Sequence, residues 1–420
     1  MTISRRGMLG SAAALGLLTA CGSNTGRDGG GDGGGGGSGP KLSHWYHQYG
    51  EQGTEQAVKK YAAAYDKARV SVQWRPGNYD QQTAAALLTK SGPDVFEVNG
   101  PTLDQIQGKQ VVDLTDLFEG VRDDFNQAVL APKTYDGKIW GIPQVVDMQM
   151  LYYRKSLLED AGVEPPRTLD ELVDAAKKLS NKKVKGLFLG NDAGAGVLGG
   201  TPLLAAGLEL VTEDGKVGFD DPAAARTLGK LHRLYADKSL LLGAPADWSD
   251  PSAFLQGLTA MQWSGLWALP AVQKALGDDF GVLPFPKDGA RGRPAVPVGA
   301  YAAAVSTRTA HEQAAKDYLK WLWIERTDYQ EDFALSYGFH IPARISLAKK
   351  AAKLRTGAAA DAVRFTTDHG FAQPLLWTPA AQTAYQDALN RIIKDGANPD
   401  SELKTVVRKV SAELDRVKSK

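Results

Sequence analysis

The sequence has little of what marks several large classes of protein. One cysteine in 420 residues excludes a disulfide framework and a cysteine-based zinc site. The 49 lysines and arginines balance the 48 aspartates and glutamates, which argues against a strongly basic nucleic-acid binder and against an acidic disordered chain. No apolar run approaches the ~20 residues of a membrane-spanning helix, which excludes a polytopic membrane protein. With 43% hydrophobic residues, the chain has material for two or three globular domains.

The N-terminus has the pattern of an export signal. Arg5 and Arg6 precede a short apolar stretch, which suits a signal peptide. The arginine pair resembles a twin-arginine signal, although the general export route stays open. Residues 18–21, Leu-Thr-Ala-Cys, resemble a bacterial lipobox, in which the cysteine is lipidated and becomes the mature N-terminus. We therefore expect a signal peptide over 1–20 and a lipid on Cys21.

A glycine-rich stretch follows the cysteine. Residues 26–39 contain ten glycines, a composition that cannot form a core and behaves as a flexible coil. A phosphate-binding loop would need a preceding strand and a following Gly-Lys-Ser/Thr, and neither is present. Residues 21–40 are therefore predicted to be a lipidated tether. It would hold the rest of the chain at the extracellular face of a bacterial cytoplasmic membrane.

From Lys41 onward, strand and helix patterns alternate. Strands are expected over 41–45, 70–74 and 94–98, with helices over 54–68 and 79–89 between them. This βαβαβ order predicts a parallel sheet flanked by helices, with ligands at the carboxyl ends of its strands. The loops at those ends carry polar and aromatic residues: His47, Gln48, Tyr49, Glu51, Asn78, Tyr79, Asn99 and Thr102.

Further along the chain, three local signals mark helix starts. Thr168 and Glu171 form a capping-box pattern, as do Thr309 and Glu312. Asp221 precedes a proline, which is typical of an N-cap followed by the first helical position. Together with a long strand expected over 144–153, these signals predict a second α/β lobe.

Two enzyme-like patterns are weak. Residues 194–199, Gly-Ala-Gly-Val-Leu-Gly, match a dinucleotide-binding fingerprint, but the polar Asn191 and Asp192 stand where a tight turn is required. His44 and His47 lie near a strand end, where their spacing sends them to opposite faces, and the other histidines lie in unrelated contexts. We therefore predict no cofactor, no metal site and no catalytic residue.

A glycan hydrolase stays open as an alternative. It would need two carboxylates that face each other, and Glu51, Asp147 and Asp192 are the candidates. Nothing in the sequence marks one of them as an acid with a raised pKa.

The aromatic residues carry more information. The chain has nine tryptophans and 14 tyrosines, and several lie in predicted loops or beside glycines. Aromatic rings stack on the apolar faces of sugars, while carboxylates and amides bind the hydroxyls. Trp267, just after Gly265, favours a binding role, whereas Trp263 is as consistent with the core as with a site. The aromatic candidates are Trp45, Tyr79, Trp248, Trp263, Trp267, Tyr301 and Trp377.

The order of several short motifs resembles one family over 41–420. It is the extracellular solute-binding proteins of bacterial ABC importers, in the carbohydrate-binding group typified by maltodextrin-binding protein. The motifs are Pro-Asp-Val-Phe at 93–96, Tyr-Asp-Gly-Lys-Ile-Trp-Gly-Ile-Pro at 135–143, Leu-Tyr-Tyr-Arg-Lys at 151–155, Ala-Met-Gln-Trp-Ser-Gly-Leu-Trp at 260–267 and Gly-Phe-His-Ile-Pro at 338–342.

This resemblance implies a two-lobe periplasmic-binding-protein-like α/β fold. Each lobe would be a mostly parallel sheet flanked by helices, and several segments would form the hinge between them. The implied boundaries are 41–145 plus 283–324 for the first lobe and 146–282 plus 325–420 for the second. The implied partners are a carbohydrate and the transmembrane subunits of an ABC permease. Membrane contact would be through the lipid alone, with no nucleic acid, and the protein would be a monomer.

The resemblance also implies ligand contacts at Gln48, Glu51, Asn99, Thr102, Asp147, Asn191, Asp192, Trp267 and Trp377. Tyr79, Trp263, Tyr301 and Gly265, close to Trp267 in its motif, complete the candidate contacts. Where many relatives show Gly-Gly before the next strand, this chain has Gly-Ala-Tyr at 299–301. Tyr301 would either narrow the site or offer a further stacking face. We expect capture of a mono- to oligosaccharide by hinge closure and its delivery to a permease. Another polar solute, such as a polyamine or a glycerophosphodiester, is the alternative ligand.

Overall fold

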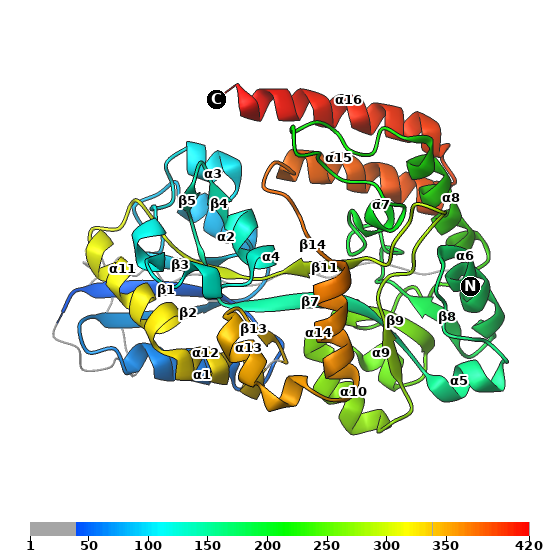
Figure 1. Cartoon of the computed structure of the whole chain (residues 1–420), viewed down its shortest axis with the longest axis horizontal. Helices are drawn as coiled ribbons and strands as arrows, with labels where there is room; N and C mark the ends of the chain where they lie inside the picture. The colour runs from blue at the N-terminus through cyan, green and yellow to red at the C-terminus, as the bar shows by residue number, and fades with distance from the viewer. Residues whose placement is uncertain (1–38, 338, 420) are drawn as a thin grey trace, which may run out of the picture. The chain divides into compact units, whose positions relative to one another are not determined.

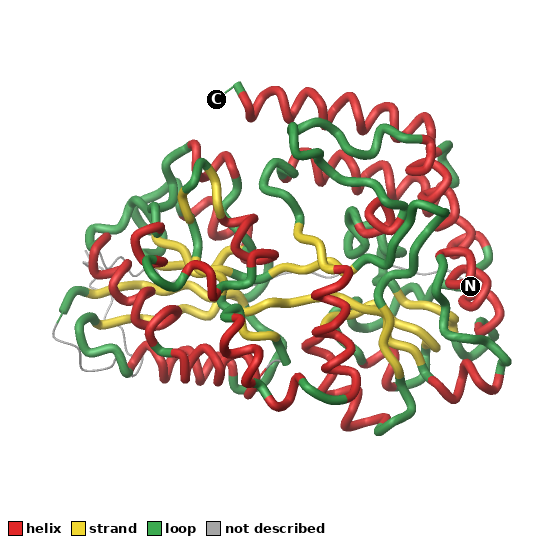
Figure 2. Tube along the Cα trace, in the orientation of Figure 1, coloured by secondary structure: helices red, strands yellow, loops and turns green. Residues whose placement is uncertain are grey.

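The computed structural model describes residues 39–337 and 339–419, which belong to one compact unit, 34–420. The expected signal peptide, most of the tether and Cys21 lie outside the described residues. Two β-sheets with helices packed around them form this unit (Figures 1 and 2). Within the described ranges, no helix is both long and apolar enough to cross a membrane.

The first sheet confirms the βαβαβ start and adds two strands from later in the chain. β1 runs parallel to β2 and to β3, whereas β12 runs antiparallel to β3 and to β6. The spatial order is β2 (Arg69–Arg75), β1 (Lys41–His47), β3 (Val95–Val98), β12 (Ala302–Val305) and β6 (Ile142–Pro143).

The second sheet is built around β7 (Val145–Tyr153), the longest strand, which crosses the middle of the view in Figure 1. β11 and β13 pair with its first half, and β9 and β10 pair with its second half, all antiparallel. The other strands are β14 (Gly370–Ala372), β11 (Val296–Gly299), β9 (Thr259–Gly265), β8 (Lys185–Phe188), β10 (Gly281–Leu283) and β13 (Ile341–Pro342), with a separate hairpin of β4 (Thr134–Tyr135) and β5 (Lys138–Ile139).

The expectation of mostly parallel sheets is therefore corrected, because both sheets are mixed. Strands that return from elsewhere in the chain enter each sheet in the opposite direction. One stretch supplies both sheets: β11 belongs to the second and β12 to the first, with only Ala300 and Tyr301 between them. Together with β7, this stretch joins the two lobes.

Helices cover the two sheets. α1 packs on β2 and α11 on β12, whereas α6 packs on β8 and α14 on β11. The helices are α1 (Thr54–Ala63), α2 (Tyr79–Ala86), α3 (Leu103–Gln107), α4 (Gln127–Leu130), α5 (Lys155–Asp160), α6 (Leu169–Leu179), α7 (Thr201–Ala205), α8 (Pro222–Ala236), α9 (Ser252–Leu255), α10 (Leu269–Leu276), α11 (Glu312–Lys320), α12 (Thr327–Asp332), α13 (Ile345–Lys350), α14 (Gly357–His369), α15 (Pro379–Asn390) and α16 (Pro399–Lys418).

Two of the three predicted helix starts are confirmed. Thr168 caps α6 in a complete capping box with Glu171, and Asp221 caps α8. The predicted capping box at Thr309 is wrong, because α11 begins only at Glu312. The Thr309 hydroxyl instead donates to Asp94 Oδ1 at 2.5 Å, a bond to the first sheet that local sequence cannot reveal.

The first lobe extends beyond its expected boundary at residue 324. Tyr329 of α12 stacks on Tyr61 of α1 with ring centroids 4.4 Å apart, and the Tyr61 hydroxyl donates to Asp332 Oδ2 at 2.5 Å. Residues 327–332 were expected in the second lobe. They lie on the first, because their aromatic face is covered by α1.

Candidate functional site

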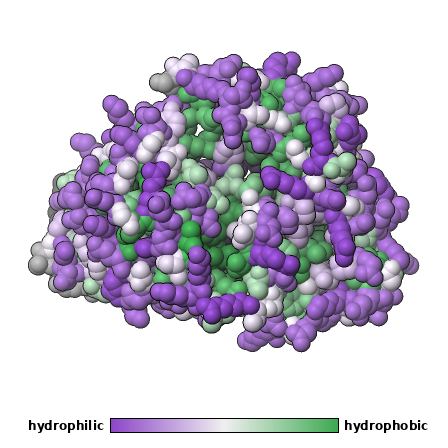
Figure 3. Space-filling view, viewed as in Figure 1, coloured by the Kyte–Doolittle hydropathy of each residue, from purple (hydrophilic) through white to green (hydrophobic). Residues whose placement is uncertain are grey.

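A cavity of about 780 Å³ lies between the two lobes. This volume falls within the range of small-molecule sites, roughly 300–1,000 Å³. In the space-filling view, hydrophobic residues gather in the hollow at the middle of this face, within a mostly hydrophilic surface (Figure 3). The polar and aromatic residues that line the cavity are Asp80, Asn99, Thr102, Asp147, Gln149, Asp192, Thr201, Asp247, Trp248, Trp267, Tyr301, Phe371, Gln373, Trp377, Thr378 and Gln382.

The cavity brings together seven of the predicted ligand contacts and leaves out six. Those on its wall are Asn99, Thr102, Asp147, Asp192, Trp267, Tyr301 and Trp377. Those that do not line it are Gln48, Glu51, Tyr79, Asn191, Trp263 and Gly265. The two lobes, β7 and the stretch between β11 and β12 all contribute to the wall. Contact with a ligand stays a prediction for the first group.

Tyr79 and Trp263 lie in the core and offer no open ring face, which corrects their expected stacking role. The Tyr79 hydroxyl is buried within 3.0 Å of the Trp45 carbonyl and 2.9 Å of the Glu97 carbonyl. Trp263 is fully buried, and its Nε1 donates to Gln149 Oε1 at 2.8 Å. Because Gln149 lines the cavity, Trp263 acts on the site by orienting this amide.

Gly265 makes room for the ring of Trp267. A Cβ atom at residue 265 would lie 2.0 Å from a carbon of that ring, a distance that no side chain can occupy. The ring is further held by its Nε1, which donates to the Ser249 carbonyl at 2.9 Å, and by an edge-to-face contact with Trp248 at 5.7 Å between centroids. Trp267 is half-buried, so part of its ring faces the cavity.

The loop after β8 is held by its own polar residues. The Asp192 carboxylate accepts from the backbone of Gly194 at 3.0 Å and of Gly196 at 2.7 Å. The Asn191 side chain exchanges two hydrogen bonds with the backbone of Ala244, at 2.8 and 3.0 Å. The glycines that matched a dinucleotide pattern thus turn around a carboxylate. Asn191 fastens the loop, and Asp192 reaches the cavity wall.

Tyr301 rests on a polar cluster of the first lobe that is centred on the buried Glu97. Its ring stacks on His47 at 4.0 Å with an angle of 16° between the planes. His47 Nδ1 lies 2.8 Å from Glu97 Oε2, and the Tyr49 hydroxyl donates to the other Glu97 oxygen at 2.6 Å. These contacts fix the ring where the chain passes from β11 to β12. Although Tyr301 lies in a connection between two strands, these contacts therefore hold its ring in one position on the cavity wall.

Trp377 contributes less open surface than Trp267. It is only 2% exposed, and its ring packs edge-to-face on Phe219 and Tyr385. Its Nε1 donates to the Gln382 side chain, which lines the cavity. Trp377 therefore backs the wall and orients an amide.

Asp147 lies in the cavity wall and is bound to a residue that the sequence did not single out. His340 Nδ1 is hydrogen-bonded to Asp147 Oδ1, and His340 Nε2 lies 3.5 Å from Glu51 Oε1. Glu51 was expected to contact the ligand, but its carboxylate turns to His340 behind the wall. Gln48 is exposed in the same loop, away from the cavity.

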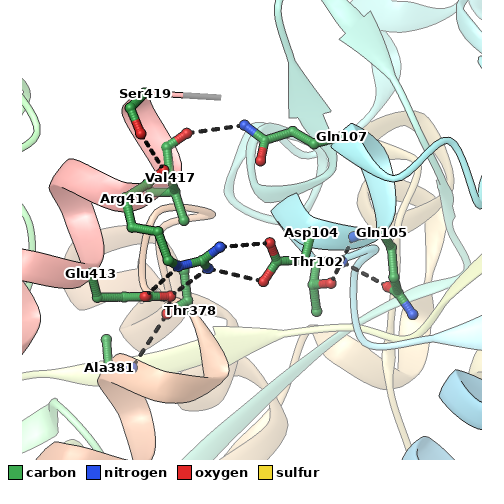
Figure 4. A network of polar contacts seen from close by, with 10 residues as sticks. All are labelled: Thr102, Asp104, Gln105, Gln107, Thr378, Ala381, Glu413, Arg416, Val417 and Ser419. Atoms are coloured by element: carbon green, nitrogen blue, oxygen red, sulfur yellow. Dashed lines mark hydrogen bonds and ion pairs between the residues drawn. The ribbon is translucent and has the colours of Figure 1, made fainter.

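Next to the cavity wall, a polar network joins the lobes (Figure 4). The Arg416 guanidinium of α16 donates to both oxygens of Asp104 in α3, at 3.0 and 3.1 Å, and also to Glu413. The Gln107 amide donates to the Val417 carbonyl at 3.0 Å. We call these contacts the α3–α16 clasp. Each end adjoins the wall, since Thr102 caps α3 and Thr378 donates to Glu413 at 2.7 Å.

The charged side chains on the cavity wall all carry the same sign. They are four aspartates, Asp80, Asp147, Asp192 and Asp247, and no lysine or arginine is among the lining residues that the structure describes. Across the described ranges, the cavity wall included, no group of three or more His, Cys, Asp or Glu residues could hold a metal ion.

Sequence reasoning missed several wall residues, and most of them carried no signal. Asp80, Gln149, Asp247, Gln373 and Gln382 have neither periodicity nor a motif. Trp248 was among the aromatic candidates in loops, and the structure places it on the wall beside Trp267. His340 was visible only as part of the motif at 338–342.

Comparison with known proteins agrees with this architecture. Residues 50–322 match the family described as "Bacterial extracellular solute-binding protein". The chain is 26% identical over 385 residues to the diacetylchitobiose binding protein DasA of Streptomyces coelicolor, covering 88% of each chain. It is 23% identical over 388 residues to the galactooligosaccharide-binding protein of Bacillus subtilis, covering 86% of this chain and 87% of that one.

A solved structure has the same fold. An ABC transporter solute-binding protein of Thermotoga lettingae, bound with α-D-tagatose, superposes with a TM-score of 0.76 at 20% identity and covers 89% of this chain and all of that one. The two-lobe fold and the match over 50–322 lead to one conclusion. The chain belongs to the family of bacterial extracellular solute-binding proteins.

Proposed function

We propose that this chain captures a mono- to oligosaccharide in the cavity between its lobes and delivers it to an ABC permease without chemical change. The observation that carries the proposal is the composition of the wall. Half-buried rings, Trp267 and Trp248 on one side and Tyr301 on the other, stand among carboxylates and amides. Rings of this kind stack on sugar faces, while the polar groups bind hydroxyls.

Relatives with named ligands support the same solute class. Two of them are named for binding diacetylchitobiose and galactooligosaccharides. In this proposal Asn99, Thr102, Asp147, Asp192 and Trp267 contact the sugar. The lobes, bounded near the residues expected above except that 327–332 belong to the first, close on the bound sugar because contacts to both lobes stabilise the closed state.

The proposal also covers where the protein is located. A lipid on Cys21 anchors the chain at the extracellular face of the cytoplasmic membrane, after export by the twin-arginine or the general route. There it works as a monomer that presents its solute to the transmembrane subunits of a permease. It is not an enzyme: Glu51 and Asp147, two candidates for a hydrolase pair, converge on His340 instead of facing each other across the cavity.

A cationic solute such as a polyamine is the second candidate. The observation in its favour is that the four charged side chains on the wall are aspartates. Carboxylates and aromatic faces bind an ammonium group as readily as they bind sugar hydroxyls.

A thermal-shift screen of residues 34–420 separates the two candidates. The panel contains diacetylchitobiose, galactobiose, maltose, mannobiose and tagatose, with spermidine and glycerophosphocholine as other solutes. A ligand at 100 times its Kd adds about 2.7 kcal/mol to the stability of the folded state, which raises Tm measurably. We expect a saccharide shift that Trp267→Ala abolishes and Trp140→Ala retains, since Trp140 does not line the cavity. A shift by spermidine alone would support the second candidate, and no shift at all would contradict both.

A further inference from the structure

A buried histidine links the cavity wall to a loop of the first lobe. His340 is 4% exposed and lies between two carboxylates, with Asp147 on Nδ1 and Glu51 on Nε2. Asp147 lines the cavity with a side chain that is 25% exposed, whereas Glu51 does not line it. The imidazole therefore has the ligand cavity on one side and a structural anchor on the other.

Strand pairing fixes this arrangement. His340 immediately precedes β13, where Ile341 pairs with Val146 of β7, next to Asp147. Asp147 is itself paired with Gly299 of β11. Glu51 lies in the loop between β1 and α1. The three side chains thus come from three distant segments of the chain, and they meet where β7 passes between the lobes.

The two carboxylates keep the imidazole charged. Burial alone would lower the pKa of His340, but the charges and hydrogen bonds of Asp147 and Glu51 outweigh burial and raise it to about 10. In return, the pKa of Glu51 is lowered although the group is buried, because His340 is its hydrogen-bond partner and counter-charge. At neutral pH the cluster is therefore a cation held between two anions.

We infer that His340 is a positioning residue for solute capture: it holds one oxygen of Asp147 so that the carboxylate presents its other oxygen to the cavity, and Glu51 holds His340. This inference rests on the proposed function, since it assigns Asp147 a hydroxyl or amine of the solute as its partner. It gives Glu51 a different role from the expected one, that of an anchor behind the wall.

The physical reason is the freedom of an aspartate without a partner. Its carboxylate can rotate about χ1 and χ2, and each rotamer places the oxygens elsewhere. A charge-assisted hydrogen bond to a buried imidazolium selects one of these orientations before the solute arrives. Loss of this bond should weaken solute binding about 10- to 100-fold, the range expected when a hydrogen bond to a charged group is removed.

Two amide substitutions at residue 340 separate the two ring nitrogens. The Asn side chain places its NH₂ near the former Nδ1, facing Asp147, and the Gln side chain places it near the former Nε2, facing Glu51. Both substitutions remove the cation, so both are made together with Glu51→Gln, which leaves Asp147 as the single carboxylate of the cluster. The two double variants thus carry the same charge. They differ only in whether the amide at residue 340 reaches Asp147 or residue 51.

The test measures binding by calorimetry, with the saccharide of the panel that stabilises the unsubstituted protein most. In the Glu51→Gln background, we expect His340→Asn to bind at least 10-fold more tightly than His340→Gln. Glu51→Gln alone, measured in parallel, gives the affinity to which both double variants are referred. Equal binding by the two position-340 variants, with melting temperatures that show both are folded, would overturn the inference while leaving the proposed function intact.

A second readout needs no ligand. The ¹⁵N shifts of the His340 ring, identified by their loss in His340→Asn, should remain those of an imidazolium up to pH 8.5. A ring that becomes neutral near pH 6.5 would overturn the inference. His47, the other imidazole near the cavity, is distinguished by its separate resonance. If no saccharide binds the unsubstituted protein, the proposed function fails first, and this inference fails with it.

Discussion

Replacing Gly265 with alanine should displace the Trp267 ring without straining the backbone. Gly265 has φ −94° and ψ 172°, an extended conformation that alanine adopts freely. The added Cβ would nevertheless lie 2.0–2.2 Å from three carbons of the Trp267 ring. Because these are the outer atoms of a half-buried side chain, the ring can move away, and we expect it to swing rather than the strand to shift.

The cost follows from the contacts that the ring gives up. The hydrogen bond from Trp267 Nε1 to the Ser249 carbonyl and the edge-to-face contact with Trp248 would both be lost. Each is worth about 0.5–1.5 kcal/mol, so Gly265→Ala should lower the free energy of unfolding by about 1–3 kcal/mol. Saccharide binding should fall as far as it does in Trp267→Ala, because the stacking face is no longer in place.

Urea unfolding and calorimetry measure both effects, and a double-mutant cycle identifies their cause. In a Trp267→Ala background the Cβ at residue 265 meets no ring, so the further substitution should cost little. Gly50→Ala is the control, since a Cβ there meets nothing within 4 Å. If Gly265→Ala costs as much without the ring as with it, or leaves binding unchanged, the assignment of Gly265 as the support of Trp267 is refuted.

Two further predictions concern the clasp and acid stability. Arg416→Met removes the guanidinium that joins α16 to Asp104, so solute affinity should fall a few-fold at low salt and match that of the unsubstituted protein in 1 M salt. Lys409→Met, at an exposed position on the same helix, is the control. Equal affinities of Arg416→Met and the unsubstituted protein at low salt would contradict the role of the clasp. Burial lowers the pKa of His44 from its usual 6.5 to about 3. Between pH 6.5 and pH 3, His44 therefore binds a proton in the unfolded chain but not in the folded one. Stability should therefore fall as pH drops from 6.5 towards 3, by up to about 1.4 kcal/mol per pH unit, and urea unfolding of His44→Gln should show a shallower decline; an unchanged decline would contradict this assignment.

Elements that follow from local patterns were predictable from the sequence. The alternation from Lys41 to Val98 gave the first three strands, and Thr168 and Asp221 marked helix starts because their side chains bond to backbone within three residues. Trp267 was singled out by its aromatic ring, its place two residues after Gly265 and the motif at 260–267, and it lies on the cavity wall. In each of these cases the cause lies within a few residues of the effect.

The rest depends on contacts between distant segments. Thr309 carries the same local pattern as Thr168, yet its hydroxyl is taken by Asp94, more than two hundred residues earlier. Glu51 and Asp147 were both predicted to contact the ligand, but only Asp147 lines the cavity, because the fold brings His340 between them and Glu51 lies behind it. Trp263 and Tyr79 resemble Trp267 in sequence, and only packing separates rings in the core from rings on the wall.

The position of β12 has a consequence for how the chain folds. This strand lies between β3 and β6 in the first sheet, yet it comes from residues 302–305, about two hundred residues after β3 and about 160 after β6. Until that part of the chain is available, β3 has an open edge and the first lobe lacks an inner strand. The N-terminal lobe should therefore not complete its fold as a chain elongates, and a nascent chain that ends before residue 302 would expose that edge to partners or proteases.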